Sequence, residues 1–142
     1  FEDSYYTFNI KFPKTIFSHM TALYFYDLAE KVPYDKYDIT VEDTYNNKKI
    51  RKHNVFYVKK DILNIGLTKV TTPSGNMIRC YDKERCICDI IRSKKRMDEE
   101  LVKKSVKGYL KRNDKDLLKL QEYAEKMGIK TKVLNYVGMF YE

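Results

Sequence analysis

The chain has 142 residues, a formal net charge of +8 at pH 7, 43% hydrophobic residues and 34% charged residues. This balance supports one packed domain and argues against disorder. No apolar run is long enough to span a bilayer and no signal peptide is recognisable, so we expect a cytoplasmic protein with no membrane partner.

The first half of the sequence predicts a small sheet with one early helix. Alternating apolar residues from Tyr6 to Phe12 predict a strand that Pro13 ends. Ser18 is a candidate N-cap for a helix over 19–30, which closes before Pro33. The next elements are a strand at 37–41, a polar loop at 42–52, a strand at 54–58, a helical turn capped by Asp61 and ended by Gly66, and a hairpin of strands 67–72 and 77–81.

The second half predicts helices. Asp82 and Asp98 are candidate N-caps for helices that run to about Lys95 and over 99–111, and Asp114 begins a third helix that Gly128 closes. A last helix is predicted over about 130–140. We therefore expect an α/β (α+β) fold. It has a small mixed β-sheet with an early helix packed on it, followed by about four C-terminal helices. Residues 1–142 form a single domain, with a sheet-containing part (1–92) and a helical part (93–142).

Positive charge is concentrated in two segments. Residues 1–47 carry a net charge of −4, whereas residues 48–60 and 92–119 each carry +6. Such asymmetry favours an acidic partner, either nucleic acid or an acidic protein surface, although charge runs are also common on solvated faces. The candidate binding residues are Lys48, Lys49, Arg51, Lys52, Lys94, Lys95, Arg96, Lys103, Lys104, Lys107, Lys111 and Arg112.

The helix that follows Asp98 is predicted to be amphipathic. Its apolar residues are Leu101, Val102, Val106, Tyr109 and Leu110, and its opposite side carries Lys103, Lys104, Lys107 and Lys111. One face of this helix should therefore pack on the domain while the other presents lysines to a partner.

No segment predicts an enzyme active site, a metal site or a cofactor. Cys80, Cys86 and Cys88 are odd in number and lack paired C-x-x-C spacing, which argues against disulfides and zinc, so we expect buried, inert thiols. His19 and His53 have no motif around them, and Ser18-His19 lacks the glycines of a nucleophile elbow.

Two alternatives remain open. Asp38, Glu42 and Asp43 with Lys48 and Lys49 are the acids and lysines that a metal-dependent nuclease would need, although the predicted strand and loop do not place them on one face. The tyrosine-rich N-terminal strand could also serve as an edge for self-association.

The helix that follows Asp82 carries charges that can pair along one face. Arg85 and Asp89 are four residues apart, and Asp89 and Arg92 are three apart. Glu84 could pair with Lys83 or with another element. A structural ion-pair network is favoured over catalysis here.

Three segments resemble the C-terminal domain of AbiEi-type abortive-infection proteins, the antitoxins of type IV toxin–antitoxin systems. The first runs from Ile16 to Leu23 and continues through Pro33 and the strand 39–41. The second includes Thr72-Pro73 through Gly75, then 81–85 and 88–92. The third consists of Tyr109-Leu110, Asp116-Leu117, Leu120, Ala124 and Gly128-Ile129. The family-motif residues in this chain are Ser18, Thr21, Leu23, Pro33, Asp82, Glu84, Arg85, Asp89 and Arg92.

The resemblance implies a bacterial phage-defence protein that is not an enzyme. Such antitoxins are transcriptional regulators with an N-terminal winged helix that binds DNA, and the C-terminal domain counteracts a nucleotidyltransferase-like toxin without a tight inhibitory complex. That domain also assists DNA binding and the assembly of copies into a homo-oligomer on DNA. Nothing ahead of Tyr5 can supply a winged helix, so we expect a fragment of a longer protein whose basic faces make accessory contacts.

Overall fold

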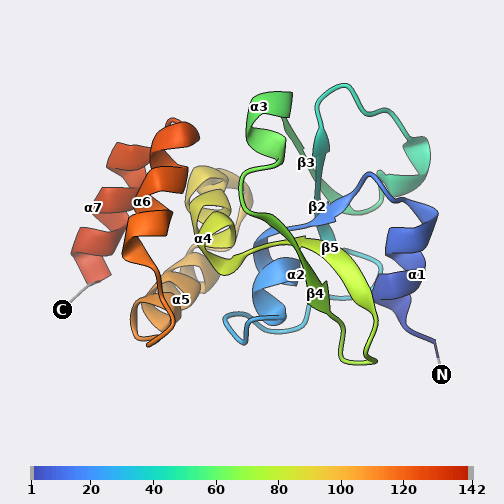
Figure 1. Ribbon diagram of the computed structural model, residues 1–142, viewed down its shortest axis with the longest axis horizontal. Helices are drawn as coiled ribbons and strands as arrows, with labels where there is room; N and C mark the ends of the chain where they lie inside the picture. Colours follow the sequence, from blue (N-terminus) through green and yellow to red (C-terminus); the bar gives the residue numbers. More distant parts are fainter. Residues whose placement is uncertain (1, 141–142) are drawn as a thin grey trace.

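The structure, a computed structural model, describes residues 2–140. A mixed five-stranded sheet occupies one half of the molecule and four C-terminal helices occupy the other (Figure 1). The predicted α/β architecture is therefore confirmed. The elements are α1 (Ser4–Lys11), β1 (Ile16–Phe17), α2 (His19–Tyr24), β2 (Asp38–Glu42), η1 (Lys48–Ile50), β3 (Asn54–Val58), α3 (Lys60–Leu63), β4 (Leu67–Thr71), β5 (Met77–Tyr81), α4 (Lys83–Arg92), η2 (Lys94–Arg96), α5 (Glu99–Leu110), α6 (Leu117–Lys126) and α7 (Lys130–Phe140).

The strand order is β3-β2-β1-β5-β4. The hairpin β4–β5 is antiparallel with Leu67 opposite Tyr81, as the turn residues predicted. The short strand β1 joins the two halves of the sheet, because it pairs antiparallel with β2 and parallel with β5. Two residues are too few to give a periodic pattern, which is why the sequence did not predict this strand.

The N-terminal segment is a helix, so its predicted strand is wrong. Asp3 caps α1 by accepting a hydrogen bond from the Tyr6 backbone N–H at 3.2 Å. The side chains of Tyr5, Phe8 and Phe12 are buried, whereas Tyr6 and Ile10 are 38% and 61% exposed. Spacings of three and four residues place the buried rings on one helical face, and this packing outweighs the period-two pattern. Residues 4–11 therefore offer no strand edge for self-association.

The first helix after β1 is shorter than predicted. It ends at Tyr24 instead of Glu30, because Asp27 adopts a left-handed backbone with φ 59°. The Leu28 N–H then bonds the Leu23 carbonyl at 2.9 Å, which is the pattern of a terminated helix.

Smaller shifts occur at other helix ends. α4 ends at Arg92 and leads into the short η2 turn, instead of running to Lys95. The cap of α6 is Asp116 and not Asp114, because the Asp116 carboxylate accepts from the Lys119 N–H at 3.0 Å. The predicted caps Asp82 and Asp98 are confirmed for α4 and α5.

One continuous cluster of buried apolar side chains extends from Tyr5 to Val133. The helix α4 is almost wholly buried and packs against α2, α5, α6 and α7. It therefore connects the sheet-containing half to the C-terminal helices.

Candidate functional site

The exposed side of α5 carries a stripe of lysines. Val102, Val106 and Tyr109 are fully buried on the opposite side, and the Ser105 hydroxyl donates to the Leu28 carbonyl at 2.9 Å. These contacts fix the rotation of the helix, so the lysines face outward. Leu101 departs from the predicted apolar face, since its side chain is 45% exposed.

Lys104, Lys107 and Lys111, the last directly after α5, have no acidic partner among residues 2–140, and the Lys107 ammonium lies 5.1 Å from the centre of the Phe140 ring. Lys103, in contrast, is held by Glu99 at 3.4 Å and by Glu100 at 3.8 Å. Lys104, Lys107 and Lys111 are exposed. Their spacings of three and four residues place them on one face over about 10 Å. We call these three residues the α5 lysine stripe.

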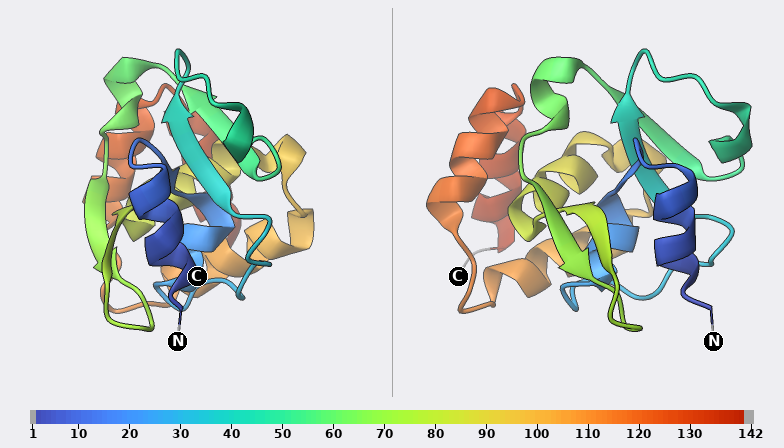
Figure 2. Two further views of the ribbon diagram at one scale, coloured as in Figure 1. Left: turned by 90° about the vertical axis from the view of Figure 1, so that its right-hand side faces the viewer. Right: turned by 45° about the vertical axis from the view of Figure 1, so that its right-hand side comes forward.

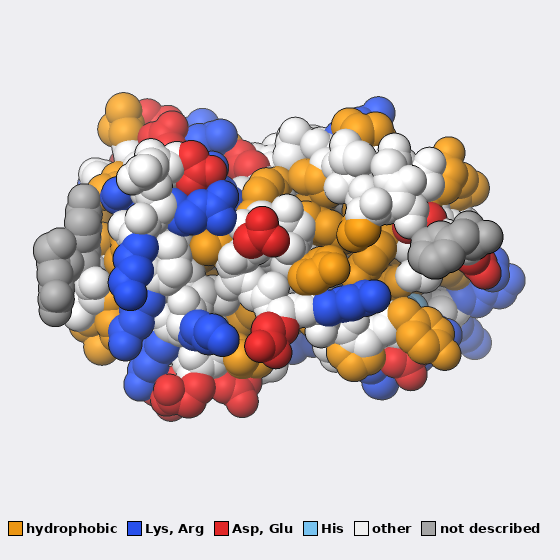
Figure 3. All heavy atoms as spheres, turned by 90° about the horizontal axis from the view of Figure 1, so that it is seen from below, with side chains coloured by type: hydrophobic (Ala, Val, Ile, Leu, Met, Phe, Trp, Pro, Cys, Tyr) orange, Lys and Arg blue, Asp and Glu red, His pale blue; other side chains and the backbone are white. Residues whose placement is uncertain are grey.

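The α5 lysine stripe forms one wall of a groove with a volume of about 980 Å³. Residues 27–33 also line the groove and contribute Asp27 and Glu30. Figure 3 shows basic side chains gathered over the helical end of this face, with acidic side chains between and beside them. Because the groove carries both signs of charge, its basic character belongs to the α5 wall and not to the groove as a whole.

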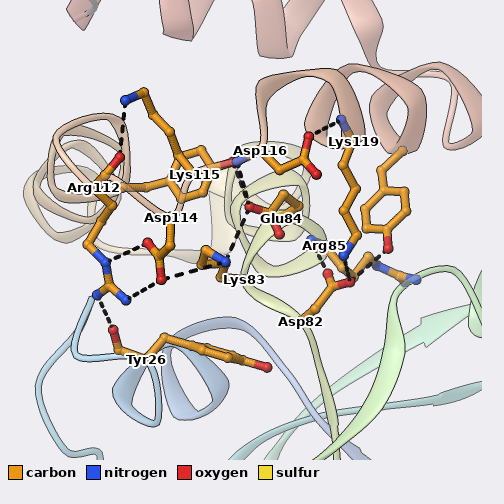
Figure 4. A network of polar contacts seen from close by, with 12 residues as sticks. Tyr26, Asp82, Lys83, Glu84, Arg85, Arg112, Asp114, Lys115, Asp116 and Lys119 are labelled. Atoms are coloured by element: carbon orange, nitrogen blue, oxygen red, sulfur yellow. Dashed lines mark hydrogen bonds and ion pairs between the residues drawn. The ribbon is translucent and has the colours of Figure 1, made fainter.

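Each of the three predicted binding arginines has a partner within the domain. Arg51 donates to the Asn46 side chain at 3.1 Å, and Arg96 and Arg112 each make two or more contacts. The Arg96 guanidinium lies 3.9 Å from the centre of the Phe56 ring and donates to the Val55 carbonyl at 3.1 Å. Arg112 bonds both carboxylate oxygens of Asp114 at 2.9 and 3.0 Å and donates to the Tyr26 carbonyl (Figure 4). These contacts fix the Arg96 and Arg112 side chains and leave them less free to meet a partner.

The η2 turn adds two further lysines near α7. The Lys94 ammonium lies 5.4 Å from the centre of the Tyr136 ring, and Lys95 is exposed.

The other predicted basic segment lies far from α5. The segment of η1 lies beside α1, at the end of the molecule opposite the C-terminal helices (Figures 1 and 2). It contains Lys48 and Lys49 and is followed by Arg51 and Lys52. The structure therefore separates the predicted basic surface into two patches. Lys11 joins the second patch from the last turn of α1. The sequence did not indicate this, because only the packing of α1 on the sheet brings Lys11 beside Lys49 and Lys52.

The charged residues of the α4 motif form a partly buried network of polar contacts, which we call the hub (Figure 4). Glu84 accepts from the Tyr109 hydroxyl at 2.7 Å and from the Asp116 N–H at 3.2 Å, and it also lies 3.7 Å from Lys83. Asp82 accepts from the Tyr123 hydroxyl at 2.7 Å and pairs with Lys119 at 3.2 Å. The two carboxylates thereby attach α4 to α5 and α6.

Arg85 and Asp89 complete the hub on the sheet side. Arg85 Nε donates to Asp89 at 3.1 Å, and Arg85 Nη1 donates to the Ile62 and Ile65 carbonyls at 2.6 and 2.7 Å. The expected pairing of Asp89 with Arg85 is therefore present. Burial opposes the charge of Arg85, but Asp89 raises its pKa. Each partner retains one buried atom, Arg85 Nη2 and Asp89 Oδ2, without a hydrogen bond among residues 2–140.

Ser18 and His19 form a buried polar pair. Ser18 Oγ lies 2.7 Å from His19 Nδ1 and accepts from the Thr40 hydroxyl, so it does not bond the α2 backbone as a side-chain cap would. The His19 ring stacks on Phe56 at 3.6 Å, and burial lowers the pKa of the imidazole. Both side chains are almost fully buried, so a substrate cannot reach them in this conformation.

Two of the remaining motif residues are also held within the fold. Thr21 accepts from the Asp38 N–H at 2.8 Å, and Leu23 lies in the core. Pro33 and Arg92 are exposed.

The acids of the nuclease alternative do not gather. Asp38 is buried and accepts from the Met20 N–H and from the Asn54 amide, each at 3.0 Å. Glu42 is four residues further along the same strand, which places it about 13 Å away. Between residues 2 and 140, no group of three or more His, Cys, Asp or Glu side chains is arranged to hold a metal ion.

The three cysteines are buried and unpaired, as expected, and burial raises the pKa of each thiol. Within the described part of the chain, no helix has the length and apolar character needed to cross a membrane.

Comparison of the sequence with protein-family models finds no match, and comparison with curated proteins finds none either.

Proposed function

We propose that this chain is the C-terminal domain of an AbiEi-type antitoxin and transcriptional regulator from a type IV toxin–antitoxin system. In this proposal it counteracts a nucleotidyltransferase-like toxin and contacts DNA through the α5 lysine stripe. The observation that carries the DNA contact is the stripe itself: three exposed lysines on one helical face with no acid in ion-pair distance among residues 2–140. Exposed lysines in such an arrangement suit a phosphate backbone, which they contact without reading its sequence.

The positions of the motif residues support the antitoxin assignment indirectly. The charged motif residues form hydrogen bonds within the domain, so in this proposal they stabilise the fold and do not form a reactive site. They are Asp82, Glu84, Arg85 and Asp89. A domain built in this way, with its free charge on a surface helix, suits a binding function better than catalysis.

A charge-neutralised variant tests the DNA contact. The triple substitution Lys104→Gln, Lys107→Gln, Lys111→Gln should weaken binding of duplex DNA and reduce the slope of log Kobs against log[salt] by about 3, since each lysine–phosphate contact contributes about 0.9. The control is Lys59→Gln, Lys60→Gln, Lys69→Gln, which removes the same charge from exposed positions outside the stripe. Equal slopes for the two triple variants would exclude the stripe from the interface.

The antitoxin function requires a test in cells. The full-length gene product should relieve the growth arrest caused by the toxin encoded beside it. The triple stripe variant in the same background then shows whether neutralisation uses this surface. No relief by the wild-type full-length product would overturn the antitoxin proposal.

A further inference from the structure

α1 and the segment around η1 lie together at the other end of the molecule (Figures 1 and 2). A second pocket lies between them. Its volume is about 480 Å³, within the range of small-molecule sites. Ser4, Thr7, Phe8 and Lys11 line it from one face of α1, because they follow helical spacing.

His53 is held rigidly in the wall of this pocket. Its Nδ1 accepts a hydrogen bond from the Tyr37 backbone N–H at 3.0 Å. The ring stacks on Tyr37 with centroids 5.3 Å apart and meets the Phe8 ring edge-on at 4.8 Å. Because Nδ1 is an acceptor, the proton of the neutral imidazole is on Nε2. His53 is only 7% exposed, and no partner for Nε2 occurs among residues 2–140, so this nitrogen is a fixed donor for a ligand.

Positive charge predominates around this donor, although Asp35 is close enough to interact with His53. Lys11, Lys49 and Lys52 line the pocket, and Glu2 is the acid that lines it among the described residues. The Lys36 ammonium adds a fourth positive charge nearby, where it bonds the Lys52 carbonyl at 2.9 Å. Several ammonium groups and one N–H donor around a single small pocket suit a compact dianion such as a phosphate monoester.

An aromatic ring stands at the same pocket. Tyr34 lines it, yet its side chain is 73% exposed, which is unusual for a large aromatic residue with no packing role. An exposed ring beside a phosphate site offers a surface on which a nucleobase can stack.

We infer that this pocket binds the phosphate monoester of a nucleotide, either a free nucleoside monophosphate or the 5′-terminal nucleotide of a nucleic-acid strand. His53 Nε2 and the lysines hold the phosphate, and Tyr34 stacks on the base. This inference does not rest on the α5 lysine stripe, since the two pockets have no lining residue in common.

The test is a titration of the chain with adenosine monophosphate, followed by NMR of the backbone amides and of the His53 imidazole. Saturable shifts of His53 and of the amides at 49–53 are expected. The double variant Lys49→Gln, Lys52→Gln should weaken binding about tenfold or more, because hydrogen bonds to charged groups contribute strongly. The double variant Lys59→Gln, Lys60→Gln is the charge-matched control and should bind like the wild type. Tyr34→Ala should weaken the nucleotide but not inorganic phosphate.

Oligonucleotides distinguish the two sources of the ligand. A strand with a 5′-phosphate that competes with adenosine monophosphate indicates a terminal nucleotide, and a strand that does not compete indicates a free nucleotide. The inference is overturned if adenosine monophosphate shows no saturable binding, if the control double variant loses as much affinity as the test variant, or if a strand with a 5′-hydroxyl competes equally well. None of these results bears on DNA binding by α5.

Discussion

Substitution of Gly66 tests whether the side chains packed around the start of α4 can shift to accommodate an added methyl group. Its backbone has φ +75°, and a Cβ added there would lie 2.7 Å from Arg85 Cβ and 2.9 Å from Asp82 Oδ1. Gly75 in the β4–β5 turn also has positive φ, at +94°, but nothing lies within 4 Å of its added Cβ. The two positions therefore share the backbone strain of an alanine and differ in crowding.

The expected magnitudes follow from these two contributions. A left-handed backbone at a residue with a Cβ costs about 1–2 kcal/mol. Overpacking adds about 1–3 kcal/mol where the neighbours cannot shift. Arg85 cannot shift easily, because its guanidinium is bonded to the Ile62 and Ile65 carbonyls and to Asp89. Gly66→Ala should therefore reduce the free energy of unfolding by about 2–5 kcal/mol, and Gly75→Ala by about 1–2 kcal/mol.

Thermal and urea unfolding followed by circular dichroism measure both variants. At about 4 °C per kcal/mol for a chain of this length, Gly66→Ala should lower Tm by about 8–20 °C and Gly75→Ala by about 4–8 °C. Equal losses for the two variants would refute the reasoning, because they would show that the neighbours of Gly66 yield without cost.

Two further predictions concern buried polar groups. Tyr109→Phe removes the hydroxyl that bonds Glu84 and the Asp116 N–H, so it should cost about 1.5–3 kcal/mol in urea unfolding, whereas the exposed Tyr57→Phe should be neutral. Burial lowers the pKa of His19 from its ordinary 6.5, so the unfolded chain takes up the proton first as the pH falls below about 6.5. Stability should therefore decrease from there toward the lower folded pKa, by at most about 1.4 kcal/mol per pH unit for this group, and a urea series from pH 7.5 to 5 should be flatter for His19→Asn. An unchanged pH profile in that variant would contradict the assignment.

The sequence predicts most of the fold because caps and turns are local. Asp82, Asp98 and the turn at 73–76 act within a few residues of themselves, and each element they begin or join is present. The N-terminal segment could not be assigned correctly in this way. Its period-two pattern is offset by the contacts of Tyr5 and Phe8 with the Phe17 and Tyr37 rings, which come from distant parts of the chain.

The candidate sites were less predictable than the fold. Net charge identified two basic segments, but it could not show that Arg96 and Arg112 are already bonded within the domain. It also could not show that Lys11 and His53 meet beside Lys52, since residues 11 and 53 are brought together only by the packing of α1 on the sheet. Composition thus indicates which residues can bind an anion, and the tertiary structure determines which of them share a site.

The two-residue strand β1 connects the two halves of the sheet, so truncation of the N-terminus should affect folding of the whole domain. Phe17 pairs with Cys80 across a loop of more than 60 residues, and β1 also holds β2 through Ile16 and Phe17. Without β1 the sheet would fall into two isolated strand pairs, β3–β2 and β5–β4, neither of which is stable alone in water. Trimming the N-terminal residues through Phe17 should therefore abolish cooperative folding instead of shortening the domain. The late closure of so long a loop should also make docking of this strand the slow event in refolding.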